Sequence, residues 1–215
     1  MAHTITKGWR MSRMLIIGPP GSGKGTQAER ISRYLEIPAI STGDIFRANV
    51  QDRTALGTEA QGYLDNGDLV PDGLTNAMVR DRLMKDDAGT GFLLDGYPRT
   101  LGQVAELAAI LEDLGERLDF VLQLTADDDE LTRRLLARAQ ETGRSDDTWS
   151  VISHRLELYR EQTERVVGSY RDRGLLIQVD GIGAVDDVTG RILAAIERRV
   201  GPEQAFLQSA PGLSL

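Results

Sequence analysis

Glycines alternate with polar residues at Gly18 to Thr26, between an apolar run and a segment with helical character. The loop reads, in succession, Gly21, Ser22, Gly23, Lys24, Gly25 and Thr26. Glycines after a strand let the backbone curl so that its N–H groups point at an anion, and the N-terminus of the following helix adds positive charge. Lys24 supplies a mobile ammonium for the terminal phosphates of a nucleotide, and Thr26 a hydroxyl near a magnesium ion. The stretch therefore predicts a phosphate-binding loop.

The position of Thr26 narrows the class of protein. In the usual motif a serine or threonine follows the lysine directly, whereas here Gly25 intervenes. This offset argues against GTPases and motor ATPases. A glycine-rich turn without a ligand is the alternative, and the order strand, loop, helix disfavours it.

A second group of chemistry-bearing residues follows the apolar run 91–95, which ends in Asp95 and continues as Gly96-Tyr97-Pro98-Arg99. Ligands of open parallel sheets bind beyond the carboxyl ends of the strands. Asp95 and Arg99 should therefore lie beside the phosphate loop. Asp95 is placed to hold magnesium or its water ligands.

Arginines form the third group. Arg134 and Arg138 are four residues apart and share one helical face, and Arg144 and Arg155 follow. A charged helix surface is the alternative interpretation. The phosphate loop favours a catalytic one, because a phosphoryl-transfer enzyme must supply several cations to the moving group.

These side chains need a scaffold, and the chain alternates strands with helices in the way of a doubly wound α/β fold. Residues 41–70 form a helical insert between the second and third strands, and Asp72 caps the helix 73–85. One long helix with apolar positions from Val151 to Tyr170 precedes the last strand. We expect residues 1–13 to form a flexible extension and 201–215 a disordered tail. The predicted strands are 14–17, 38–40, 91–95, 120–124 and 175–179.

Composition excludes several classes of function. The chain of 215 residues is 40% hydrophobic, which suits one sizeable core. Its net charge of -8 argues against a general nucleic-acid binder. It has no cysteine, so disulfides, thiolate nucleophiles and cysteine-based zinc sites are excluded. With no apolar run near the roughly 20 residues of a membrane span, we expect no membrane association and a cytoplasmic location.

Five motifs together resemble the adenylate kinases over about residues 12–200. They are GPPGSGKGT at 18–26, STGDIFR at 41–47, GDLVP at 67–71, GFLLDGYPRT at 91–100 and GRSDD at 143–147. The resemblance implies a P-loop NTPase fold with a five-stranded parallel sheet flanked by helices. It implies a kinase domain over 14–200, with a nucleoside monophosphate-binding insert at 41–70 and a short lid at 138–148. The implied reaction is reversible transfer of a phosphoryl group from Mg-ATP to AMP, giving two ADP. We expect a monomer, and no structural zinc because the chain has no cysteine.

The resemblance also implies roles for individual residues. The catalytic cations would be Lys24, Arg99, Arg134, Arg138, Arg144 and Arg155. ATP would be bound by Gly21, Ser22, Gly23, Lys24, Gly25, Thr26, Arg134, Arg138 and Gly183. AMP would be bound by Thr42, Arg47, Asp68, Leu69, Val70, Gly96, Tyr97, Pro98, Arg99, Gln103, Arg144 and Arg155. Asp95 would serve the magnesium ion.

Two rival functions remain at this point. A sibling kinase acting on UMP or CMP would tend to carry a small apolar residue in place of Thr42, so the threonine favours AMP. A nucleotide-dependent switch or binding module would need no full set of arginines around two phosphate groups, so the complete set in this chain argues against such a module. In-line transfer between phosphates needs no protein nucleophile, and of the two histidines, His3 lies in the extension and His154 on a helix surface.

The link between Arg138 and Arg144 is only Ala139 to Gly143. So short a link cannot form a separate domain. We expect it to act as a flap that carries both arginines over the phosphates.

Overall fold

The computed structural model describes residues 12–142 and 148–207, with the side chains of 12–140 and 148–199. Within them a five-stranded sheet has the order β2-β3-β1-β4-β5, and every pairing is parallel. Its strands are β1 (Arg13–Ile17), β2 (Ala39–Ser41), β3 (Phe92–Asp95), β4 (Phe120–Thr125) and β5 (Leu176–Asp180). The predicted α/β fold is confirmed.

Buried aliphatic residues explain why β1 lies at the centre of the sheet. All five residues of β1 are buried, as expected for a parallel strand covered on both faces. Leu15 pairs with Leu94 on one side and with Val121 on the other. The loop that follows β1 therefore emerges from the buried centre of the sheet.

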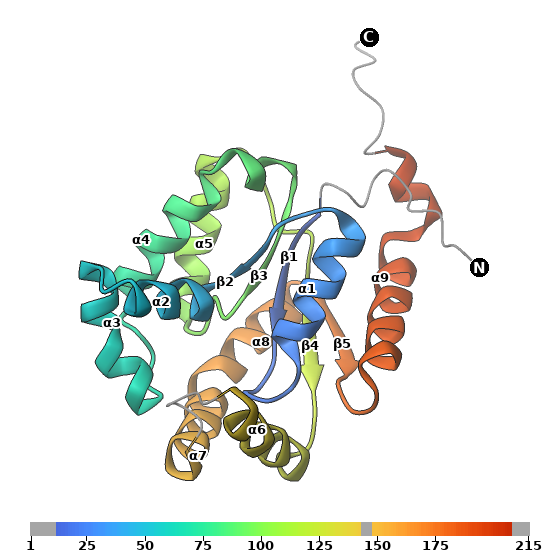
Figure 1. Cartoon of the computed structure of the whole chain (residues 1–215). Helices are drawn as coiled ribbons and strands as arrows, with labels where there is room; N and C mark the ends of the chain where they lie inside the picture. The colour runs from blue at the N-terminus through green and yellow to red at the C-terminus, as the bar shows by residue number, and fades with distance from the viewer. Residues whose placement is uncertain (1–11, 143–147, 208–215) are drawn as a thin grey trace.

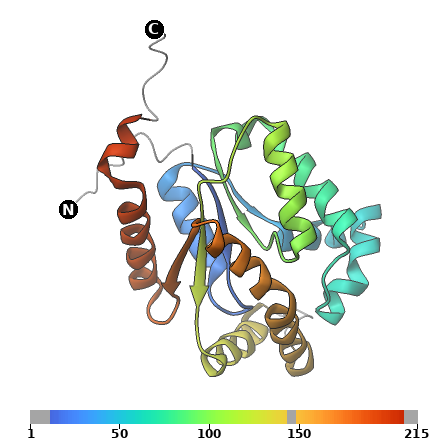
Figure 2. The ribbon, with the colours of Figure 1, turned by 180° about the vertical axis from the view of Figure 1, so that it is seen from behind.

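Helices cover both faces of the sheet (Figures 1 and 2). On one face α1 (Lys24–Leu35) and α9 (Val185–Leu207) enclose a core with Ile16, Leu93 and Leu122. On the other, α4 (Asp72–Leu83), α5 (Leu101–Asp113) and α8 (Glu164–Asp172) enclose a core with Leu15, Leu94 and Val121. Alternate strand residues point to opposite faces, which accounts for the two separate cores.

The predicted helical insert contains α2 (Thr42–Gln51) and α3 (Ala55–Asn66). Each begins at a hydroxyl cap, since Ser41 accepts from the backbone N–H of Asp44 and Thr54 from that of Gly57. Gly57 packs so closely on the backbone of Asn49 that a side chain there would overlap it. The two helices are thereby held as one unit, to the left of the sheet in Figure 1.

Two further helices lie beyond the carboxyl ends of the strands, α6 (Asp128–Thr142) and α7 (Trp149–Leu158). They occupy the end of the molecule toward which the strand arrows point in Figure 1. A short 3-10 helix, η2 (Asp86–Thr90), leads into β3.

The structure corrects several boundaries. Arg13, assigned to the extension 1–13, begins β1, and its guanidinium binds Glu116 and the carbonyl of Gly89. The terminal helix runs to Leu207, into the range 201–215 that was predicted to be disordered; Glu203 to Leu207 are residues that tolerate a helix. Residues 1–11, 143–147 and 208–215 lie outside the described structure.

Two helix predictions also need correction. The long helix after residue 148 is divided by a π-helical turn, η3 (Tyr159–Thr163), between α7 and α8. Asp72 lies one residue inside α4, and its carboxylate accepts from Thr100 and Gln103 instead of capping the helix. The partners of Asp72 are about 30 residues away in the chain, so sequence periodicity does not register them.

Candidate active site

The phosphate-binding loop connects Ile17, the end of β1, to Lys24, the start of α1. Gly21 and Gly23 have φ angles of 84° and 88°, a region that residues with a Cβ rarely adopt. A Cβ at Gly21 would also lie 2.8 Å from the carbonyl oxygen of Leu131. Among the described side chains none caps the N-terminus of α1, and its first turn holds no acidic residue. The loop therefore presents an uncompensated helix N-terminus to an anion.

Lys24 is held inside this loop, where its ammonium donates to the carbonyl oxygen of Pro19 at 2.8 Å. The pKa of Lys24 is lowered from 10.5 to about 8, mainly by burial. Asp95 opposes the change, and the charges of Arg99, Arg155 and Arg138 add to it. The lysine thus has little solvation to lose when an anionic ligand arrives.

Asp95 is the carboxylate of this centre. Burial raises the pKa of Asp95, and the nearby charges of Lys24 and Arg99 oppose that rise. A Cβ at Gly25 would lie 3.8 Å from its Oδ2 atom, so the carboxylate faces the first turn of α1.

A cleft of about 500 Å³ opens over the loop and gathers cations from five parts of the chain. It also contains Asp44 and Asp95 and the loop residues Gly21, Gly23, Gly25 and Thr26. Of the cations predicted from sequence, it brings together Lys24, Arg47, Arg99, Arg134, Arg138 and Arg155. Two residues predicted to bind ATP are not part of the cleft lining. Ser22 is buried within the loop, and Gly183 lies on an exposed turn. Arg144 lies outside the described residues.

Arg134 is oriented by contacts at both ends of its guanidinium. Its Nε donates to Glu130 at 2.6 Å and its Nη1 to the carbonyl of Gly181 at 3.0 Å. Glu130 also binds Arg133, and the two arginines lower the pKa of Glu130 to about 2. Sequence reasoning missed Glu130, although its spacing of four residues from Arg134 is a readable signal for a helical ion pair.

A smaller pocket of about 40 Å³ lies on the other side of Arg99. Its walls combine apolar side chains with three buried polar ones, Thr42, Thr75 and Gln103. The Thr42 hydroxyl donates to the carbonyl of Asp95 at 3.4 Å, and the backbone N–H of Arg99 donates to Gln103 Oε1 at 2.7 Å. The apolar walls and backbone come from Phe46, Leu64, Leu69 and Val70, with Gly43, Asp68, Thr75 and Gly96 completing the lining.

Tyr97 lies behind Gln103, one of the residues that line this pocket. Tyr97 is almost fully buried, and its hydroxyl donates to Asn76 at 2.9 Å and to the carbonyl of Gln103 at 3.2 Å. Burial raises the pKa of Tyr97 above its usual value, so it stays a neutral donor.

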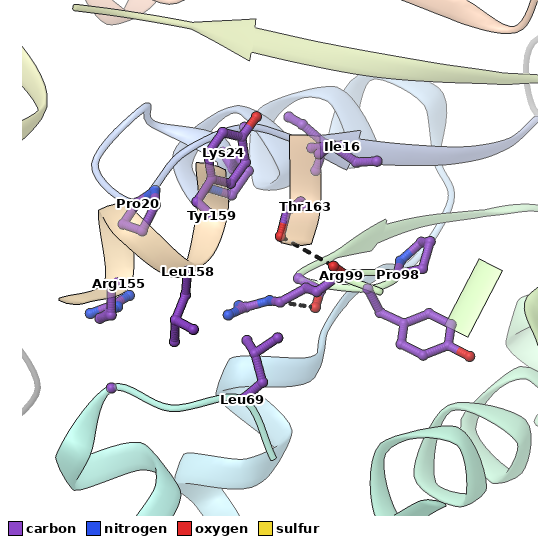
Figure 3. A pocket seen from close by; sticks show the side chains of 15 residues that line it. Ile16, Pro20, Lys24, Leu69, Pro98, Arg99, Arg155, Leu158, Tyr159 and Thr163 are labelled. Carbon is purple, nitrogen blue, oxygen red and sulfur yellow. Dashed lines mark hydrogen bonds between the residues drawn. The ribbon is translucent and has the colours of Figure 1, made fainter. Parts of the chain in front are cut away.

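Figure 3 shows the region between cleft and pocket, where Arg99 extends toward Leu158 and Leu69. Arg99 Nε donates to the carbonyl of Gly96 at 2.9 Å, and its carbonyl accepts from Thr163, in the π-helical turn, at 3.3 Å. His154, predicted to be a plain surface residue, is half-buried against the insert: its Nε2 lies 2.7 Å from Asp68 Oδ1. A Cβ at Gly67 would overlap Val151, so the end of α3 rests directly on α7.

Comparison with known proteins agrees with this arrangement. A family model described as adenylate kinase matches residues 16–175. The chain is 66% identical over 188 residues to an adenylate kinase of Kocuria rhizophila, which covers 87% of this chain and 100% of that protein. It is 67% identical over 187 residues to an adenylate kinase of Pseudarthrobacter chlorophenolicus, covering 87% of this chain and 97% of that protein. The chain belongs to the adenylate kinase family.

Membership of the adenylate kinase family confirms the sequence-based prediction of a phosphotransferase and gives no support to a binding module without turnover. A more distant adenylate kinase, from Thermobifida fusca, is still 54% identical over 187 residues, covering 87% of this chain and 99% of that protein. No helix in the described part of the chain is long and apolar enough to cross a membrane. Among the same residues, no group of three or more histidine or acidic side chains could hold a metal ion by itself.

Proposed function

We propose that this adenylate kinase transfers a phosphoryl group reversibly from Mg-ATP to AMP, giving two ADP, and that Arg99 marks the boundary between its two nucleotide sites. The observation that carries the proposal is the convergence of Lys24 and six arginines on one cleft that adjoins a small pocket. Transfer between two phosphates needs positioning and charge neutralisation, not a protein nucleophile. This constellation supplies both.

ATP occupies the phosphate loop in this proposal. The backbone N–H groups of residues 21–26 receive its phosphates, and Lys24 leaves the carbonyl of Pro19 to follow the charge of the transferring group. Arg134 and Arg138 approach from α6. The contacts of Arg134 with Glu130 and Gly181 support this role, because a cation already oriented loses little freedom on binding.

AMP occupies the smaller pocket, with its base against Thr42, Val70 and Gln103 and its phosphate toward Arg47 and Arg99. Arg155 reaches both phosphate groups, since it borders both the cleft and the region between the sites. We assign Arg144 the same task, carried in by the short lid. Asp68 and Leu69 contribute backbone, and Gly96, Tyr97 and Pro98 form the turn that places Arg99. Gly183 retains its expected place near the ATP adenine.

Asp95 fits a magnesium ion that arrives with ATP. Its carboxylate is buried at the foot of the cleft beside the first turn of α1, and hard oxygen ligands suit Mg²⁺, which takes its remaining ligands from phosphates and water. When bound, the ion neutralises charge on the phosphate oxygens. Asp95 would hold it directly or through water. We expect no structural zinc, because the chain has no cysteine, and we expect a monomeric cytoplasmic enzyme.

A coupled assay tests the reaction and its acceptor. Purified enzyme with Mg-ATP is offered AMP, CMP or UMP, and ADP formation is followed. Rapid turnover with AMP alone is expected. Faster turnover with CMP or UMP would reassign the acceptor, and ATP binding without transfer to any monophosphate would reject the proposal.

A compound that joins adenosine to adenosine through a phosphate chain tests whether the two sites adjoin. Because it binds only the folded chain, it should raise the melting temperature by mass action. The rise should exceed that with ATP and AMP together at the same concentrations. An equal or smaller rise would place the two sites apart.

A further inference from the structure

The carboxylate of Asp72 lies outside the proposed catalytic machinery, yet it is connected to the pocket by two short hydrogen bonds. Its Oδ1 accepts from Gln103 Nε2 at 2.7 Å, and its Oδ2 accepts from the Thr100 hydroxyl at 2.7 Å. Thr100 in turn caps α5 by accepting from the backbone N–H of Gln103 at 3.1 Å. Asp72 therefore joins the first turn of α4 to the first turn of α5.

The amide of Gln103 is constrained from two sides by groups whose roles cannot be exchanged. The backbone N–H of Arg99 can only donate, so it requires the amide oxygen, at 2.7 Å. The carboxylate of Asp72, when ionised, can only accept, so it requires the amide nitrogen. If the amide turned over, its NH2 group would face the Arg99 N–H and its oxygen would face the carboxylate. Both changes are unfavourable, and the side chain is 2% exposed, so water cannot compensate.

An amide has two lone pairs on oxygen and two hydrogens on nitrogen. One of each is used in the contacts with Arg99 and Asp72, which leaves one acceptor and one donor for the pocket that Gln103 lines. Adenine presents the complementary pair, a donor at N6 and an acceptor at N1. Hypoxanthine presents the reverse, an acceptor at O6 and a donor at N1. An amide held in one orientation can therefore distinguish AMP from IMP, whereas an amide free to turn could serve either.

We propose that Asp72 is a positioning residue for base selection, which holds the Gln103 amide in the orientation that fits adenine and excludes hypoxanthine. This inference rests on the proposed placement of the AMP base against Gln103. Asp72 contacts no nucleotide; it acts by making the wrong orientation of Gln103 costly.

The test uses Asp72→Asn, which keeps the shape of the side chain. An asparagine can turn its own amide to satisfy Gln103 in either orientation, so only the Arg99 N–H still opposes the turned state. The ratio of kcat/KM for AMP to kcat/KM for IMP should fall by about tenfold, the equivalent of one hydrogen bond to a charged group. The change should lie in the KM values of the two monophosphates, with kcat for AMP and the KM for ATP nearly unchanged. Asp72→Ala should narrow the ratio as well, because a water molecule in place of the carboxylate can donate or accept.

Two comparisons make the outcome decisive. Asp187→Asn removes a first-turn carboxylate from the exposed start of α9 and should leave the ratio unchanged. Gln103→Leu removes the amide that is proposed to bind the base, and it should abolish most of the selection between AMP and IMP. If Gln103→Leu leaves the ratio intact, the base is not read there, and the assignment of the AMP site fails.

If Gln103→Leu collapses the ratio but neither Asp72 variant changes it, the positioning role of Asp72 alone is overturned. Equal losses of activity with AMP and IMP, accompanied by a lower melting temperature, would show that Asp72 only joins two helices. That result would also overturn the proposal.

Discussion

The cleft over the phosphate loop and the pocket around Gln103 are built in different ways. The cleft is large, about 500 Å³, and is lined mainly by charged side chains and glycines. The pocket is small, about 40 Å³, and is lined by apolar groups with a few buried hydrogen-bonding ones. One therefore neutralises charge, and the other recognises shape and polarity.

The difference extends to how each region holds its polar groups. In the cleft, Lys24 binds a carbonyl and Arg134 a carboxylate, contacts that an incoming phosphate can replace or join. In the pocket, Gln103 is bound by a backbone N–H and a carboxylate that stay in place. Changes in the cleft should thus act on rate, and changes in the pocket on the choice of base.

Lys24→Met should have the largest effect of all and separate rate from folding. Cationic groups that act on a phosphoryl-transfer transition state can be worth roughly a thousandfold in rate or more. Because the charged lysine is costly to bury, the variant should melt at the same temperature as the unaltered enzyme or higher at pH 7. Steady-state kinetics and calorimetry measure the two quantities. Unchanged turnover in a folded variant would remove the phosphate loop from the mechanism.

Gly21→Ala should weaken ATP binding next most strongly. A non-glycine residue in the left-handed region costs about 1–2 kcal/mol, and the added Cβ would meet Leu131 at 2.8 Å. We expect the KM for ATP to rise about tenfold or more while the KM for AMP changes little. Gly190→Ala in α9 is the control, since a Cβ there meets nothing within 4 Å. An equal effect of both variants would mean that the loop conformation is not needed.

The pH dependence of kcat/KM should report the protonation of Lys24. With a pKa of about 8 in the free enzyme, Lys24 loses its proton above that pH, so kcat/KM should fall up to tenfold per pH unit there and stay level below. Bound phosphates favour the ammonium, so kcat should hold to higher pH. In Lys24→Met the break near pH 8 should vanish. A break that persists would assign it to another group.

The lowered pKa of Lys24 also affects the free energy of unfolding, which should rise over the pH range in which kcat/KM falls. Below pH 8 the lysine is charged in both the folded and the unfolded chain, so its desolvation destabilises the fold in full. Between about 8 and 10.5 the folded chain binds fewer protons than the unfolded one. The contribution of Lys24 to stability should therefore improve as pH rises through this window.

Thr42→Ala should have the smallest effect, and only on the choice of base. One neutral hydrogen bond is worth about 0.5–1.5 kcal/mol, so the preference for AMP over CMP or UMP should narrow about two- to tenfold. Thr58→Ala, on an exposed face of the same insert, is the matched control. Preference ratios that stay constant across the three acceptors would exclude Thr42 from base selection.

Much of this protein could be predicted from its sequence because the relevant signals are local. The phosphate loop is a run of adjacent residues whose glycines dictate the backbone, and the strands are short apolar runs separated by helical periodicity. The caps at Ser41 and Thr54 are likewise set by residues three positions apart. Physical rules that act within a few residues determine such features, so the fold class and the placement of Asp95 and Arg99 beside the loop followed from them.

Other features depend on residues far apart in the chain. Arg13 joins β1 because its backbone pairs with Phe92, and its guanidinium is held by Glu116 and the carbonyl of Gly89. His154 in α7 meets Asp68 of the insert, 86 residues away in the chain. Asp72 has the sequence position of a helix cap, but α5 offers its carboxylate two donors, Thr100 and Gln103, and these contacts prevail. A side chain that could form several local hydrogen bonds instead binds the partner that tertiary packing places beside it. The tertiary structure therefore decided which carboxylate orients Gln103, while the sequence alone had determined that a phosphate loop would stand at the end of β1.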